Sequence, residues 1–219
     1  LNEFSPDLNA RSDVRSEIGV DLQTPLIGMF ARFHPQKDHK NFISAAGILH
    51  ESFPGVHFLL AGAGITPDNR EMLTWLQASG ILDQTHLLGL REDMPRLMSA
   101  VDIASLSSAY GEALPLVIAE SMACGIPCAV TNIGDSALII GNMGRVVPPG
   151  DPKALSLAWE ELLTLPARDR HALGVRTRQK ISLEYNINRV SELYLALYHS
   201  ILDSGETNGK KIPKKNSSL

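Results

Sequence analysis

The sequence predicts an α/β protein built on a doubly wound parallel sheet. Short apolar runs that end in turn-forming residues alternate along the chain with segments of helical periodicity. Strands that alternate with helices in this way pair in a parallel sheet with helices on both faces. Of the 219 residues, 44% are hydrophobic and 20% are charged, a composition that is ordinary for a folded globular domain.

The predicted elements follow one another from residue 26. The apolar run Leu26–Phe30, bounded by turn formers, is typical of a buried strand. Apolar spacing of three and four residues then predicts a helix at 41–53. Asp68, with Glu71 three residues later, resembles a capping box and predicts a helix through Ala78. By the same reasoning we expect the remaining strands at 56–61, 85–88, 101–106, 127–130 and 145–147, and the remaining helices at 93–100, 115–124, 151–164, 167–183 and 187–202.

Bulk properties exclude several classes of function. The formal net charge is −4, so no basic surplus favours a nucleic-acid partner. No stretch approaches the roughly 18 apolar residues of a membrane span. Cys124 and Cys128 are too few for a disulfide framework, and we expect buried thiols in a reducing compartment. The histidines lack zinc-ligand spacing and no Asp-x-Asp pair occurs, so we expect no metal site and no cofactor.

The carboxyl ends of the strands are where ligands bind in such a sheet. The turn after the first strand carries Arg32 and Lys37. Arginine provides a bidentate fork for phosphate oxygens and lysine a point charge, with ordinary surface charges as the alternative interpretation. The Gly-Ala-Gly turn at 62–64 lets a ligand approach the backbone, but Pro67 replaces the third glycine of a dinucleotide fingerprint.

Two carboxylates, Glu112 and Glu120, are separated by seven residues that indicate a turn and an apolar helix. Pro115 suits the first helical position, and Gly125 suits the stop. An unpartnered carboxylate such as Glu120 is costly in such a helix, so its partner is either internal or a ligand that carries hydroxyls. The helix dipole alone favours Glu112 before the helix, yet with the free N–H groups it also suits a hydroxyl-rich ligand.

Taken in order, these features resemble those of the group 1 (family 4) glycosyltransferases, which have the GT-B fold. The resemblance covers about residues 20–200 and corresponds to the family's C-terminal, donor-binding half, a Rossmann-like domain. The stretches that carry it are Arg32 with Lys37, the turn at 62–64, Leu88-Gly89-Leu90 with Asp93-Met94-Pro95, Glu112 and Glu120 followed by Ser-Met-Ala-Cys-Gly-Ile-Pro, and 144–151.

The resemblance implies four segments. Residues 1–24 would be a remnant of an interdomain linker, with one weak helical stretch at 11–18, and residues 25–184 would be the nucleotide-sugar-binding domain. Residues 185–203 would be a crossover helix that packs on an N-terminal domain, and the polar tail at 204–219 is expected to be disordered. The first residue is not Met, so we expect a piece of a longer chain whose N-terminal GT-B domain carries the acceptor site.

The resemblance also implies roles for individual residues. Arg32 and Lys37 would hold the diphosphate of a nucleotide sugar and stabilise the charge of the leaving group. Glu112 would contact the transferred sugar, which makes these three the candidate catalytic residues. Glu120 would bind the ribose hydroxyls, and Arg91 would lie near the base, mostly through backbone contacts. The backbone would approach the donor at Gly62, Gly64, Ala113, Leu114 and Leu116.

Two positions depart from the family pattern. Ala113 stands where glycine is usual, which alters the close backbone approach expected there. Asp135 follows Gly134 where many members have a second glycine, and the sequence assigns it no role.

We therefore predict the donor-binding half of a retaining glycosyltransferase. It would move a sugar, without a metal ion, from a nucleotide diphosphate-sugar to a polysaccharide or a lipid-linked acceptor, and it would turn over poorly alone. Two alternatives remain open: a non-catalytic nucleotide-binding module and a GT-B nucleotide-sugar epimerase. The expected location is the cytoplasm, with peripheral contact at the inner face of the plasma membrane left open.

Overall fold

The computed structural model describes residues 3–207, which fall into two units. The first, which we call the body, ends at Ser182, and the second begins at Leu183. The strands of the body are β1 Leu26–Phe30, β2 His57–Ala61, β3 Thr85–Leu87, β4 Ile103–Leu106, β5 Cys128–Thr131 and β6 Gly144–Val147. Its helices are α1 Leu8–Glu17, the short 3-10 helix η1 Pro35–Lys37, α2 His39–Ser52, α3 Arg70–Ala78, α4 Met94–Ala100, α5 Leu116–Ala123, α6 Ser136–Ile140, α7 Pro152–Leu163 and α8 Ala167–Glu184, whose last two residues belong to the second unit.

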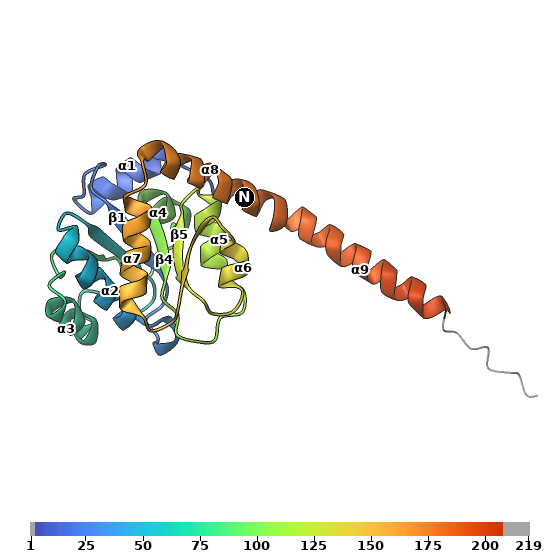
Figure 1. Cartoon of the computed structure of the whole chain (residues 1–219), viewed down its shortest axis with the longest axis horizontal. Helices are drawn as coiled ribbons and strands as arrows, with labels where there is room; N and C mark the ends of the chain where they lie inside the picture. The colour runs from blue at the N-terminus through green and yellow to red at the C-terminus, as the bar shows by residue number, and fades with distance from the viewer. Residues whose placement is uncertain (1–2, 208–219) are drawn as a thin grey trace, which may run out of the picture. The chain divides into compact units, whose positions relative to one another are not determined.

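The six strands form one parallel sheet in the order β3-β2-β1-β4-β5-β6 (Figure 1). This confirms the predicted doubly wound sheet. β1 and β4 are neighbours at its centre, with Ile27 level with Ile103. The chain builds outward from β1 to β3 and then returns to β4 on the other side, so the strand order reverses between β1 and β4. Such a switch point leaves a crevice between the two following loops, where open α/β sheets bind ligands.

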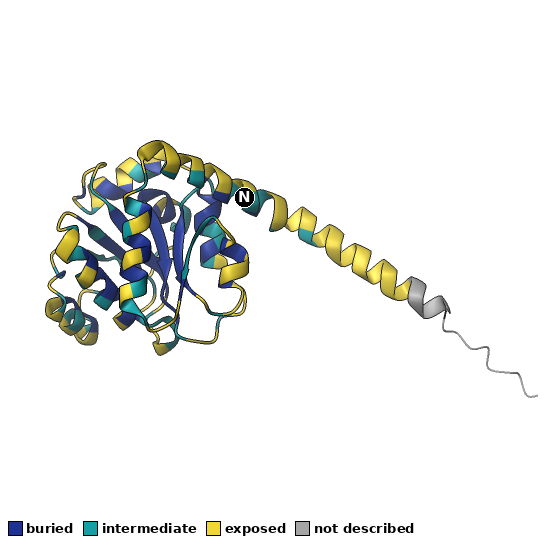
Figure 2. Ribbon diagram, viewed as in Figure 1, coloured by how far each residue is buried: buried dark blue, intermediate teal, exposed yellow. Residues whose placement is uncertain are grey.

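Two hydrophobic cores cover the two faces of the sheet. Successive residues of a strand point to opposite faces, so Ile27 and Met29 join the core beneath α2, α3 and α7. Leu26 and Phe30 join the core beneath α1 and α4. Figure 2 shows the strands buried and the exposed residues on the outer sides of the helices. The burial of both faces explains why β1 is an unbroken apolar run rather than an alternating one.

The segment at 1–24 contributes to the body through α1. Asp7 caps the first turn of this helix with its side chain. Arg15 is fully buried, and it donates to Asp102 Oδ2 and to the Ala100 carbonyl oxygen, each at 2.8 Å. A buried ion pair therefore holds α1 on the sheet, a contact that the polar composition of this segment did not indicate.

Several element boundaries differ from the prediction. Asn69 rather than Asp68 caps α3, because the Asn69 side chain accepts from the Met72 amide. α5 begins at Leu116 rather than at Pro115, whose backbone is extended (ψ 93°). η1 and α6 were not predicted, since they have only three and five residues and cannot show a helical period.

The second unit contains α9, Ile187–Thr207. Its apolar side chains Leu193, Leu197 and Tyr198 are exposed. α9 includes residues 204–207 of the segment predicted to be disordered, and the rest of that prediction, 208–219, lies outside the described residues. In the part of the chain that is described, no helix has the length and apolar character needed to cross a membrane.

Candidate functional site

Two loops are joined at the switch point. One follows β1 and ends in η1, and the other, residues 107–115, connects β4 to α5. The amide of Ala109 donates to the Gln36 carbonyl oxygen at 2.9 Å. The side-chain amide of Gln36 donates in turn to the Gly111 carbonyl oxygen at 2.7 Å. These bonds set the relative position of the two loops that carry the predicted charged residues.

Lys37 and Glu112 form an ion pair across this junction. Lys37 Nζ lies 2.5 Å from Glu112 Oε1. The two side chains are only 17% and 9% exposed, so solvent screens this pair less than a surface salt bridge. Ser108 Oγ donates to the same carboxylate oxygen, also at 2.5 Å. The structure thus brings together two of the three candidate catalytic residues and adds Ser108, which the sequence did not single out.

The loop after β5 supports Glu112 from another side. Gly134 has a φ of +56°, and a Cβ there would lie 2.3 Å from the Glu112 carbonyl oxygen. Glycine is therefore required both by the left-handed backbone and by the close contact. The Asp135 amide donates to the Ala113 carbonyl oxygen at 2.8 Å. This backbone support is the structural role of the Gly134-Asp135 pair, which no motif had indicated.

Arg32 and the start of α5 border the same junction. The Arg32 side chain is exposed beside the end of β1. No side chain caps α5, so the first amides of this helix present free donors and the positive end of its dipole. Ala113 is exposed, and Leu114 and Leu116 are 44% and 61% exposed. The predicted backbone-contact residues of this segment are therefore accessible to a ligand.

The Gly-Ala-Gly turn packs against the loop that follows β1. A Cβ at Gly62 would lie 2.2 Å from the Ala31 carbonyl oxygen, and a Cβ at Gly64 would lie 3.0 Å from Phe33 Cβ. Both glycines are thus needed for packing within the body. Their approach to a ligand stays a prediction.

The Arg91 side chain links parts of the body. Its Nε lies 2.8 Å from Asp93 Oδ1 and its Nη1 lies 2.5 Å from Glu17 Oε1. Hydrogen bonds to Asp93 and then Glu17 raise the pKa of Arg91, and the bonds from Arg91 lower the pKa of both carboxyls. The side chain joins the loop after β3 to α1, so a base contact by this residue would fall to its backbone.

Glu120 lies one turn into α5 and is half-buried. Among the side chains described, those of residues 3–202, and the backbone of residues 3–207, its carboxylate has no hydrogen-bond donor and no salt-bridge partner. Burial, and then the charge of Glu3, raises the pKa of Glu120 above its usual value. The sequence left either an internal partner or a ligand with hydroxyls for this carboxylate, and the described residues provide no internal partner. The group is suited to a ligand that donates hydrogen bonds.

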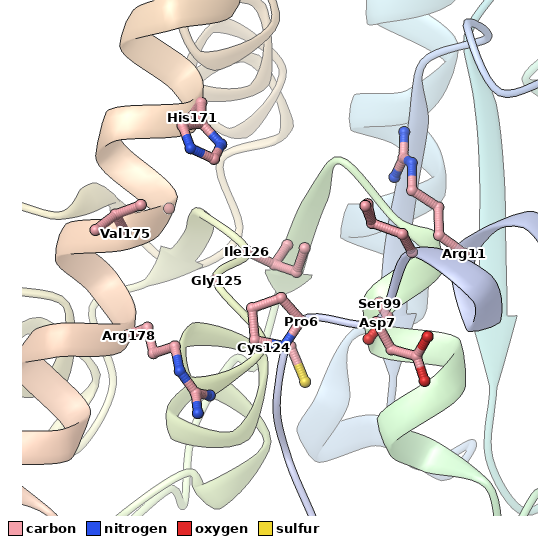
Figure 3. A pocket seen from close by; sticks show the side chains of 12 residues that line it. Pro6, Asp7, Arg11, Ser99, Cys124, Gly125, Ile126, His171, Val175 and Arg178 are labelled. Atoms are coloured by element: carbon pink, nitrogen blue, oxygen red, sulfur yellow. The ribbon is translucent and has the colours of Figure 1, made fainter.

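A cavity of about 290 Å³ lies apart from this junction, between the start of α1, the end of α5 and α8 (Figure 3). Since α5 starts at the carboxyl edge of the sheet, its end and this cavity lie at the opposite edge. Arg178, which lines the cavity, donates to the Phe4 carbonyl oxygen at 3.0 Å. Arg11 donates to Asp102. These charged side chains hold the body together, and none of the predicted site residues lines the cavity.

Cys124 and Cys128 are free and buried, as predicted. Burial raises the pKa of the Cys124 thiol to about 11, which keeps it protonated and unreactive at neutral pH. Among residues 3–207, no group of three or more His, Cys, Asp or Glu side chains is placed to hold a metal ion.

Comparisons with known proteins relate the chain to one family. The model of the family described as glycosyl transferases group 1 matches residues 10–180. The chain is 29% identical over 145 residues to the UDP-Gal:alpha-D-GlcNAc-diphosphoundecaprenol alpha-1,3-galactosyltransferase of Escherichia coli, a match that covers 65% of this chain and 37% of that protein. It is 28% identical over 202 residues to the alpha-maltose-1-phosphate synthase of Mycolicibacterium smegmatis, which covers 86% of this chain and 51% of that protein. The chain thus spans about a third to a half of the length of these curated relatives.

Solved structures share the fold. Anabaena Alr3699/HepE, in complex with UDP and glucose, matches with a TM-score of 0.80 at 20% identity over 91% of this chain and 54% of that chain. The C-terminal domain of the group 1 glycosyl transferase LpcC from Francisella tularensis matches with a TM-score of 0.71 at 22% identity, over 85% of this chain and 97% of that chain. The family match extends over most of the body, from α1 to α8. This chain belongs to the group 1 glycosyl transferases.

Proposed function

We propose that this chain is the donor-binding half of a retaining glycosyltransferase, which transfers a sugar from a nucleotide diphosphate-sugar to a polysaccharide or lipid-linked acceptor. Family membership supports the reaction class, and two matching structures of HepE are complexes of that protein, one with UDP and glucose and the other with UDP-glucose. The E. coli relative is named for a UDP-galactose donor and a diphosphoundecaprenol-linked acceptor.

The observation that carries the proposal is the Glu120 carboxylate, half-buried one turn into α5 and without a partner in the described residues. A pair of vicinal ribose hydroxyls would supply the missing donors, since carboxylates commonly hold ribose in this way. Ribose at Glu120 would direct the diphosphate toward the start of α5, whose amides and dipole favour an anion.

Lys37 and Arg32 are the cations available to the diphosphate. Lys37 is already held at the junction by Glu112, so it would meet the phosphates without a large rearrangement of the chain. Charge that develops on the leaving nucleoside diphosphate would be stabilised by these two side chains and by the amides of α5, without a metal ion. Glu112 would contact the hydroxyls of the transferred sugar.

The acceptor belongs to the other half of the enzyme in this proposal. An N-terminal GT-B domain would carry the acceptor site, so this chain alone would bind the donor and turn over poorly. We place the reaction in the cytoplasm, where nucleotide sugars are available, with contact at the inner face of the plasma membrane supplied by the acceptor domain.

Calorimetric titration of the chain with UDP, GDP and ADP tests the proposal. We expect one nucleoside diphosphate to bind in the presence of EDTA, and binding to fall at least about tenfold in Arg32→Ala and Lys37→Ala, because each removes a charged contact to phosphate. Lys153→Ala, an exposed site on α7, is the matched control and should bind like the wild type. Equal affinity in all four proteins would show that Arg32 and Lys37 do not hold the phosphates.

A further inference from the structure

Glu112 Oε1 has two hydrogen-bond donors at the junction. Ser108 Oγ and Lys37 Nζ each lie 2.5 Å from this oxygen. Both of these bonds go to Oε1, and Glu112 Oε2 makes no hydrogen bond to the side chains described at 3–202 or to the described backbone. One oxygen of the carboxylate is therefore occupied by the protein, and the other remains available to a ligand.

The Ser108 hydroxyl is not needed to hold its own backbone. Ser108 is fully buried two residues after the end of β4, and its carbonyl oxygen accepts from Thr131 Oγ1 at 2.7 Å. The backbone of Glu112 packs closely against Gly134, and the Asp135 amide donates to the neighbouring Ala113 carbonyl oxygen. These contacts do not restrain the side-chain torsions of Glu112. Ordering a flexible side chain in one rotamer has an entropic cost.

We propose that Ser108 is a positioning residue for Glu112: it holds the carboxylate in the rotamer that presents Oε2 to a hydroxyl of the donor sugar. This inference rests on the proposed function, and it adds a residue that was not among the predicted site residues. A neutral hydroxyl suits this role, because it donates to the carboxylate without competing with Lys37 for the phosphates. Ser108 itself makes no contact with the donor in this arrangement.

The inference predicts that Ser108 affects the affinity for the nucleotide sugar and not the affinity for the nucleoside diphosphate. If Ser108 only stabilised the fold, its replacement would change both affinities together. Ser108→Ala should leave the affinity for the nucleoside diphosphate within about twofold of the wild type. It should lower the affinity for the matching nucleotide sugar about three- to tenfold, because only the sugar depends on the position of Glu112. The ratio of the two dissociation constants is therefore the measured quantity.

The ratio is measured on the whole chain by titration with three pairs of probes: UDP and UDP-glucose, GDP and GDP-mannose, and ADP and ADP-glucose. Ser99→Ala is the matched control, because Ser99 is also buried and its hydroxyl also donates a hydrogen bond, but to the Pro95 carbonyl oxygen on α4 and away from Glu112. Ser108→Cys keeps the size of the side chain and weakens the donor, so it should give an intermediate ratio if the alanine variant folds poorly.

A double-mutant cycle shows whether Ser108 acts through Glu112. In the Glu112→Ala background, the second change Ser108→Ala should leave the ratio unchanged, since no carboxylate remains to be positioned. An equal loss for diphosphate and nucleotide sugar, or a further change of the ratio in the Glu112→Ala background, overturns the inference alone. Absence of binding of all six probes to the wild type overturns the proposed function and the inference that rests on it.

Discussion

Lys37 and Glu112, which are 75 residues apart in the chain, join the loops after β1 and β4 through a contact of 2.5 Å. Neither residue lies in a regular strand or α-helix of the sheet, so their meeting depends on the parallel pairing of β1 with β4. The pair links the two loops that border the crevice at the switch point. Its removal therefore has consequences for stability as well as for binding.

The first prediction concerns the energy of this pair. Lys37→Ala leaves a mostly buried carboxylate with only Ser108 as a donor, and we expect a loss of about 1–3 kcal/mol in the free energy of unfolding. Glu112→Ala should cost a similar amount, and the double variant less than the sum, because the two residues share one interaction. Urea denaturation of the four proteins measures this, and strict additivity would contradict it.

The second prediction concerns Glu120. Glu120→Gln removes a charge that burial disfavours, so the free protein should gain stability, with a rise in Tm of about 1–3 °C at pH 7. Because the pKa of Glu120 is raised in the folded state, the folded protein binds a proton at the Glu120 carboxyl more tightly than the unfolded chain does. The stability that this linkage contributes is present at low pH and is lost as pH rises through the raised pKa. The advantage of Glu120→Gln should therefore disappear in acid.

Ligand binding should respond in the opposite direction. Removal of the carboxylate should weaken nucleoside diphosphate binding by about 1–3 kcal/mol, because buried hydrogen bonds to ribose are lost. Calorimetry on Glu120→Gln and Glu120→Ala measures this. A variant that is more stable and also binds as tightly as the wild type would argue against a ribose site at Glu120.

The third prediction concerns Gly134. Gly134→Ala places a Cβ 2.3 Å from the Glu112 carbonyl oxygen in a backbone with positive φ, so it should cost at least about 2 kcal/mol of stability. Gly150→Ala is the matched control: its φ is +69°, and no atom lies within 4 Å of the added Cβ. It should cost only about 1 kcal/mol of backbone strain. Equal losses in thermal unfolding would mean that the contact with Glu112 contributes nothing.

The fourth prediction concerns the buried ion pair of α1. Asp102 accepts from Arg15, from Arg11 and from the Leu26 amide of β1. Asp102→Ala leaves the buried Arg15 without its counter-ion, and we expect a loss of about 3–5 kcal/mol. The exposed pair of Arg145 with Glu161 is the control, and Arg145→Ala should cost at most about 1 kcal/mol. A chain that lacks residues 1–24 should also be destabilised, because it loses Arg11 and Arg15 and leaves Asp102 without these two cations.

The fifth prediction concerns a pair of histidines on β2 and β3. His57 Nδ1 lies 3.0 Å from His86 Nε2, so one ring donates to the other and both cannot be charged without repulsion. Burial, and then the charge of His57, lowers the pKa of His86 to about 4. As the pH falls, His86 therefore becomes protonated in the unfolded chain before it does so in the folded protein. Stability is lost as pH falls from about 6.5 toward 4. His86→Gln should flatten this part of the stability profile by about 1 kcal/mol between pH 7 and pH 5, as measured by urea denaturation.

The sequence by itself determined the class of sheet and the rim that carries the site. Apolar runs such as Leu26–Phe30 had to be strands buried on both faces, and the helical segments between them required parallel pairing. The charged residues at 32, 37, 112 and 120 could be placed near strand and helix ends because such placement follows from chain order alone. The family followed from the same ordered motifs.

Only the tertiary structure decided which of these residues touch one another. The bond from Ser108 to Glu112, the support from Gly134 and the burial of Arg15 against Asp102 depend on side chains that come from distant segments. Local patterns contain no information on such contacts, because each is created when separate loops pack at the same edge of the sheet. The structure likewise left Glu120 without an internal partner, which turned a costly carboxylate in an apolar helix into the strongest indication of a ligand.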